Sequence, residues 1–139
     1  MADLLWLCPV TSSFSVHGMR PLVNWLRRIG GSACIGAIVV LSLLPAQEMA
    51  RTGAPKGFEH FIAYCGTAAV LSLGLSRREV LLRAALLCAL SVLMEALQAF
   101  SPGRSPKMSD VVASSLGGLA GAMLGLAINA VMARRGTSA

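Results

Sequence analysis

Acid–base and hydrogen-bonding side chains lie at the borders of apolar runs in this chain of 139 residues. Glu95 and Gln98 are three residues apart and His60 and Tyr64 are four apart, so each pair shares one face of a helix. Histidine and carboxylates can transfer protons, and an arginine beside them can bind a phosphate or a carboxylate. The predicted polar cluster is Glu59, His60, Tyr64, Glu95, Gln98, Arg104 and Asp110.

The composition indicates where these residues are placed. Hydrophobic residues make up 55% of the chain and charged residues 13%, against about 25% charged in soluble domains. A soluble chain of this length could not bury so much apolar side chain, so the lipid bilayer is the expected partner. The net charge of +6 falls in the gaps between apolar runs, where aromatic residues are sparse. The charge therefore indicates membrane topology rather than nucleic-acid binding.

The apolar runs predict an all-α polytopic membrane protein with four transmembrane helices. At 1.5 Å per residue, a run of about 20 residues crosses the roughly 30 Å hydrocarbon core. Pro45 is expected to end the first helix, Arg77 to Glu79 the second, and Pro102 the third, while Ser109 or Asp110 caps the fourth. The predicted helices cover residues 29–47, 58–76, 80–100 and 111–133.

The distribution of Lys and Arg predicts the orientation. Counted over alternate loops, eight lie on one side and four on the other, which favours cytoplasmic termini in a multi-pass protein of the inner membrane. The predicted polar cluster then lies at one depth on the outer side. The first side has Arg20, Arg27, Arg28, Arg77, Arg78, Arg83, Arg134 and Arg135; the other has Arg51, Lys56, Arg104 and Lys107.

The ends and the cysteines define the domain. Residues 1–18 lack the basic start and cleavage site of a signal peptide, so we expect an arm that is flexible or, with Met19 as the start, not translated. Residues 19–135 form the membrane domain and 136–139 a tail. The four cysteines form no CxxC pair, and we predict no metal site, no cofactor and no disulfide framework.

Small residues recur on the last predicted helix. Gly117, Gly121 and Gly125 are spaced by four, which forms a ridge that lets a neighbouring backbone approach closely. The neighbour is a helix of the same chain, a second copy in a homo-oligomer, or another membrane protein.

Structural roles are alternatives for several cluster residues. Asp110 can cap its helix, and Glu95 can pair with Arg104 to clasp the hairpin of the third and fourth helices. His60 can be an interfacial histidine.

Three segments carry a family resemblance. EHFIAY at 59–64, EALQAFSPGR at 95–104 and SDVVASSLG at 109–117 resemble the VanZ-like family of bacterial integral membrane proteins, over roughly residues 19–133. The family pattern has Asp-Lys before the histidine of the second helix and an Asn after the aspartate of the fourth. This chain departs from it at Lys56-Gly57 and at Ser114.

The resemblance implies a cell-envelope protein, because the family is named after a member associated with resistance to the glycopeptide teicoplanin. One hypothesis is recognition of a polar or anionic head group on a lipid-linked envelope precursor. A second is a membrane enzyme, with His60 or Glu95 as acid or base, Arg104 and Lys107 stabilising an anion and Asp110 orienting His60. No motif fixes a catalytic residue. A third is a structural subunit that docks through the glycine ridge.

Overall fold

The computed structural model describes residues 16–45, 47 and 53–137, and no strand is present among them. The all-α prediction is confirmed for this part of the chain. Residues 1–15 of the expected arm and residues 138–139 of the tail lie outside it. The helices are α1 (Val16–Trp25), the π-helix η1 (Leu26–Gly30), α2 (Gly31–Leu43), α3 (Lys56–Ser72), α4 (Arg77–Gln98) and α5 (Met108–Thr137).

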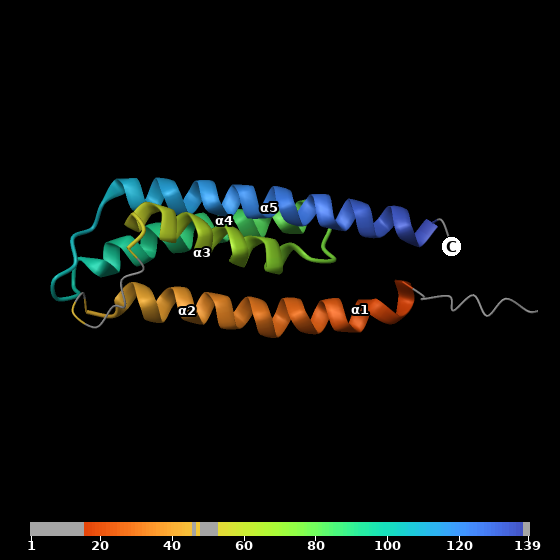
Figure 1. The fold of residues 1–139 in the computed structure, drawn as a ribbon, viewed down its shortest axis with the longest axis horizontal. Coiled ribbons are helices and arrows are strands. Elements are labelled where there is room, and N and C mark those ends of the chain that lie inside the picture. The colour runs from red at the N-terminus through yellow and green to blue at the C-terminus, as the bar shows by residue number, and fades with distance from the viewer. Residues whose placement is uncertain (1–15, 46, 48–52, 138–139) are drawn as a thin grey trace, which may run out of the picture.

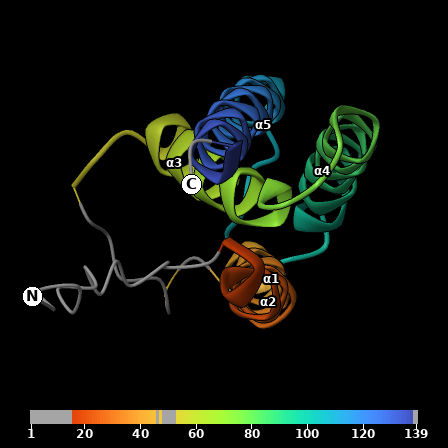
Figure 2. The same ribbon diagram turned by 90° about the vertical axis from the view of Figure 1, so that its right-hand side faces the viewer.

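The helices form four rods that alternate in direction, because α1, η1 and α2 follow one another as a single rod (Figure 1). α3 lies at the centre, with α5, α4 and the first rod around it (Figure 2). The loop end of the bundle holds the connection 99–107 between α4 and α5. The terminal end holds the start of α1 and the end of α5 (Figure 1).

Three rods are long and apolar enough to cross a membrane, namely Pro21–Leu43, Arg77–Gln98 and Met108–Arg135. No more than 33% of the apolar window of each is buried inside the protein. The remaining apolar surface would be unfavourable in water and is suited to contact with lipid. α3 has 17 residues and is therefore only about 25 Å long.

The glycine ridge of α5 packs against α3 of the same chain. A Cβ atom at Gly117 would clash with the carbonyl oxygen of Phe61, and one at Gly121 with the carbonyl oxygen of Cys65. Only glycine allows the two backbones to lie this close. Because the ridge is used inside the chain, the hypothesis of a subunit that docks through it loses its main support.

α3 ends at Ser72, so the predicted boundary at residue 76 was wrong. Gly74 follows with a φ of 68°, a left-handed conformation that favours glycine. Asn129 of α5 closes this turn: its Nδ2 donates to the carbonyl oxygens of Ser72 and Leu75 at 2.8 and 3.1 Å, and its Oδ1 accepts from the Gly74 N–H at 2.8 Å. A residue 55 positions away thus sets the end of α3.

Arg77 to Glu79 begin α4 and do not close α3, as had been expected. Ser76 is the N-cap residue, and its hydroxyl accepts from the Glu79 N–H while the Glu79 carboxylate accepts from the Ser76 N–H. This capping box satisfies two amide groups that would otherwise lack partners.

The predicted ends of the first and last helices also needed correction. The first rod is helical from Val16 rather than from residue 29, and it ends at Leu43, with Leu44 extended before Pro45. α5 begins at Met108, so Asp110 lies inside the first turn and is not the cap.

Candidate functional site

Three polar helix edges meet inside the bundle at its loop end. Ser91, Glu95 and Gln98 of α4 are all buried, as their shared face predicted. Tyr64 of α3 and Asp110 of α5 are also buried. The polar edges therefore face protein, while the apolar faces point outward.

Lys56 lies where these edges meet. Its ammonium nitrogen is 2.5 Å from Oδ2 of Asp110, 3.2 Å from Oε1 of Gln98 and 3.8 Å from Oε1 of Glu95. As the first residue of α3, it keeps its side chain 36% exposed, whereas those of Glu95 and Asp110 are 8% and 4% exposed. One partly exposed cation therefore binds acceptors from two other helices.

His60 is the remaining member of this group. Its Nε2 lies 4.0 Å from Oδ2 of Asp110, and one ligand atom each of His60, Glu95 and Asp110 lies within 4.8 Å of the others. We call Lys56, His60, Glu95, Gln98 and Asp110 the Lys56 cluster. With a neutral imidazole its net charge is −1, because two carboxylates face one ammonium.

Glu95 also holds the start of α5. Its Oε1 accepts a 2.6 Å hydrogen bond from the backbone N–H of Lys107, the residue before the helix. The carboxylate thus satisfies an unpaired amide and lies near the positive end of the α5 dipole. The predicted clasp between α4 and α5 exists, but Glu95 forms it with the Lys107 backbone and not with Arg104.

Arg104 binds the end of α2 instead. Its Nε and Nη2 donate to the carbonyl oxygens of Leu44 and Leu41, at 3.1 and 2.5 Å. Ser101 donates to the carbonyl oxygen of Leu43 at 3.2 Å. The α4–α5 connection therefore caps α2, since the last carbonyls of a helix lack partners within it.

The structure thus brings together His60, Glu95, Gln98 and Asp110 from the predicted set. Tyr64 lies one turn along α3 from His60 and is buried. Glu59 is one residue from His60 and therefore points about 100° around α3 from it. Arg104 contacts α2, as described.

Lys56 is the cluster residue that the sequence reasoning missed. It lies four residues before His60, so the stripe of His60 and Tyr64 extends back to it. The predicted start of this helix at residue 58 placed Lys56 in a loop, which concealed the spacing. The donors His60, Glu95 and Asp110 come from three helices, so no local motif could show them as a possible metal-ligand set.

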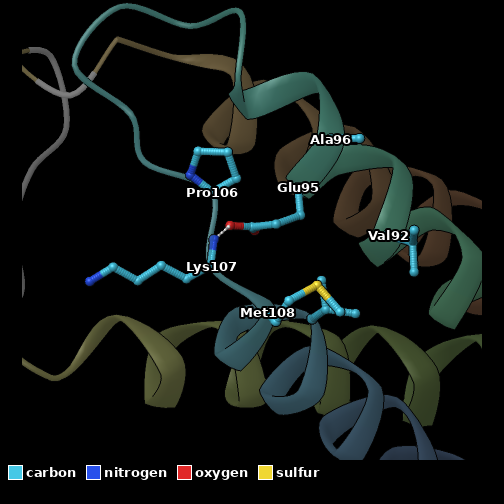
Figure 3. A pocket seen from close by; sticks show the side chains of 7 residues that line it. Val92, Glu95, Ala96, Pro106, Lys107 and Met108 are labelled. Atoms are coloured by element: carbon cyan, nitrogen blue, oxygen red, sulfur yellow. Dashed lines mark hydrogen bonds between the residues drawn. The ribbon is translucent and has the colours of Figure 1, made fainter.

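A pocket of about 240 Å³ lies beside the cluster, between the end of α4 and the start of α5. Figure 3 shows Glu95 at the pocket, with its carboxylate on the Lys107 N–H and the Lys107 side chain directed away. Exposed Val92 and Met108 form part of the wall, so the pocket borders the outward apolar surface. Its lining residues are Val92, Glu95, Ala96, Pro106, Lys107, Met108 and Val111.

Apolar rods around a buried group of charged side chains define a small helical membrane protein with a polar interior site. The chain belongs to the VanZ/LLP1 family, whose family model matches residues 37–129. This match runs from α2 to Asn129 of α5 and includes the whole Lys56 cluster. No curated protein and no solved structure matches the chain.

Proposed function

We propose that this VanZ-family protein binds the polar head group of a lipid-linked cell-envelope molecule at the outer surface of the inner membrane. The observation that carries the proposal is the position of Glu95, which belongs both to the Lys56 cluster and to the pocket. An apolar part of a ligand can enter from the bilayer between α4 and α5. Its head group then reaches a carboxylate held at the membrane surface.

The side-chain amide of Gln98 indicates that the head group provides a hydrogen-bond acceptor. Gln98 is 0% exposed, and its Oε1 accepts from Lys56, but its Nε2 has no hydrogen-bond partner. A buried donor without a partner is unfavourable by about 1–3 kcal/mol, so an acceptor oxygen from a ligand would be favoured there.

The charges favour a head group rich in hydroxyl and amide groups over a bare anion. Arg104 is engaged by α2 and Lys56 by two carboxylates, and Lys107, which also lines the pocket, directs its side chain away from it (Figure 3). Carboxylates accept hydrogen bonds from the hydroxyl groups of sugars and the amides of peptides. Sugar or peptide parts of a lipid-linked precursor therefore fit better than a phosphate alone.

The membrane arrangement belongs to the same proposal. α3 is the fourth span, because it packs against α5, α4 and the first rod and turns its apolar Phe58 and Ile62 outward. Both termini are cytoplasmic, as the excess of Lys and Arg at the terminal end favours. The loop end, with the Lys56 cluster and the pocket, then faces outward.

The test is ligand-induced stabilisation of the purified protein in nanodiscs. A lipid-linked sugar–peptide precursor should raise the unfolding temperature by several degrees, whereas a phospholipid with the same acyl chains should not. Glu95→Gln and Gln98→Leu should abolish the shift. Arg78→Gln, an exposed change at the terminal end, serves as the control. An equal shift in Glu95→Gln, or none in the unmodified protein, contradicts the proposal.

An enzymatic role is the second candidate, favoured by the geometry of His60. Its ring lies near both Asp110 and Glu95, within reach of proton transfer through a small movement or one water molecule. The engagement of Arg104 with α2 removes one of the groups expected to stabilise an anion. If the precursor is turned over, His60→Gln should stop turnover and leave binding intact. A binding protein shows no turnover in either form.

A further inference from the structure

The position of the Lys56 ammonium resembles that of a bound cation. Around it lie two carboxylate oxygens and an amide oxygen, and an imidazole nitrogen lies 4.0 Å from the Asp110 oxygen. Carboxylate, amide and imidazole groups are also the ligands of divalent metal ions in proteins. We propose that His60, Glu95 and Asp110 form a site for a divalent transition-metal ion such as Zn²⁺ or Mn²⁺, which the Lys56 ammonium occupies in exchange with the metal.

The donor atoms are close enough for this exchange. One ligand atom each of His60, Glu95 and Asp110 lies within 4.8 Å of the other two. In a tetrahedral site with bonds of about 2.1 Å, ligand atoms are roughly 3.4 Å apart. The donors must therefore approach one another by up to about 1.4 Å, which side-chain torsions can provide. The Gln98 amide oxygen is a fourth donor beside them.

The charges of the site match a divalent ion. With Lys56 in place and a neutral imidazole, two buried carboxylates face one positive charge. When the ammonium leaves and a divalent ion enters, the two negative charges are balanced. Buried charges are stable only when they are paired, so the surplus negative charge favours the exchange.

Asp110 provides an independent indication of a ligand. Its Oδ2 is fully buried, and the ion pair with the Lys56 nitrogen 2.5 Å away takes the place of a hydrogen bond. Asp110 is 3% exposed and is directed into the centre of the cluster. A metal ion in place of the ammonium would bind this same oxygen.

Lys56 can leave the site, whereas the carboxylates cannot. It is the first residue of α3, at the loop end, and its side chain is already 36% exposed. A long lysine side chain can turn its ammonium into water while its methylene groups remain on the protein. Glu95 and Asp110 are held in the interior by α4 and α5. Metal binding would therefore move Lys56 and preserve the bundle.

Metal binding by the purified full-length chain in nanodiscs tests this inference, which does not depend on the proposed head-group ligand. Equilibrium dialysis against Zn²⁺ or Mn²⁺ should give one ion per chain. Lys56→Gln should raise the affinity at least tenfold, because it removes the competing ammonium. His60→Gln and Asp110→Asn should each lower it at least tenfold.

Lys107→Gln is the matched control for charge. It removes a cation from the same end of the bundle but leaves the cluster intact, so it should change the affinity by less than threefold. The metal should also raise the unfolding temperature of Lys56→Gln more than that of the unmodified chain.

Three outcomes overturn the inference. They are no saturable binding by the unmodified chain, binding that His60→Gln and Asp110→Asn leave unchanged, and an equal gain from Lys56→Gln and Lys107→Gln. If Lys56→Gln or Asp110→Asn does not fold, the comparison of the unmodified chain with His60→Gln decides.

Discussion

The Lys56 ammonium nitrogen lies 2.5 Å from Oδ2 of Asp110, and this ion pair joins the first turn of α3 to the first turn of α5. The two partners differ in burial, since Asp110 is held inside and Lys56 reaches the surface. Removing Lys56 and removing Asp110 should therefore change the free energy of unfolding by different amounts.

Lys56→Met should lower the free energy of unfolding by about 2 kcal/mol, because it leaves a buried carboxylate without its cation. The effect is smaller than for a fully buried ion pair, because Lys56 is partly exposed to solvent. Asp110→Asn should have a smaller effect, about 1 kcal/mol, because the freed ammonium can turn into water. Denaturant unfolding in detergent micelles measures both, with Lys107→Met as the control. A double variant whose loss equals the sum of the single losses would show that the pair contributes no coupling.

Gly121→Ala should destabilise the protein by about 1–3 kcal/mol, because its Cβ would meet the Cys65 carbonyl oxygen and α3 would have to move. Gly118→Ala is the matched control on the same helix, since a Cβ there has no neighbour within 4 Å. It should leave stability unchanged or raise it slightly through helix propensity. Equal unfolding temperatures for the two variants would show that α5 does not pack on α3 through this ridge.

Arg104→Met should lower the free energy of unfolding by about 1–3 kcal/mol and leave head-group binding intact in the folded protein. The reason is that its guanidinium binds the α2 carbonyls of Leu41 and Leu44 rather than the cluster. Hydrogen exchange should increase in the last turn of α2. A variant with normal stability and lost ligand binding would instead support the direct contact with an anion that the sequence suggested.

Asn129→Leu should lower stability by about 2 kcal/mol, because three hydrogen bonds to the α3–α4 turn are lost with little change in volume. The rate of hydrogen exchange at the Gly74 amide should increase in the same variant. Ala130→Leu, at an exposed position on the next residue, is the control. Unchanged exchange at Gly74 would contradict the role of Asn129.

Cysteine labelling in whole cells tests the proposed orientation. In a background without Cys8, Cys34, Cys65 and Cys88, a cysteine at exposed Ser105 should react with a membrane-impermeant maleimide in intact cells. A cysteine at exposed Arg78 should react only after the membrane is opened. The opposite pattern would place the pocket on the cytoplasmic side.

Features that depend on local periodicity were predictable from the sequence. Apolar runs gave the helices, the three-residue spacing gave the buried face of Glu95 and Gln98, and the four-residue spacing gave the glycine ridge. In each case the signal lies within one helix, so a single segment contains all the information.

Features set by contacts between distant segments were not predictable in this way. α3 ends where Asn129 closes its turn, and Arg104 turns to α2 because unpaired carbonyls lie there. Lys56 was counted only as a topology signal, and Arg104 was expected to bind an anion in the polar cluster, so neither the Lys56 cluster nor the cap on α2 followed from the sequence. The four-residue spacing of Lys56 and His60 was visible in the sequence. It places the two side chains on one helix face only if α3 begins at Lys56.

Asn129 and Asp110 both lie on α5, which follows α3 and α4 in the sequence. Until α5 has entered the membrane, the turn after α3 lacks its Asn129 partner and Lys56 lacks its closest carboxylate. A chain interrupted before α5 would therefore leave these polar groups at the two ends of the bundle without their partners. The same helix thus completes both ends of the bundle, through Asn129 at the α3–α4 turn and through Asp110 at the Lys56 cluster.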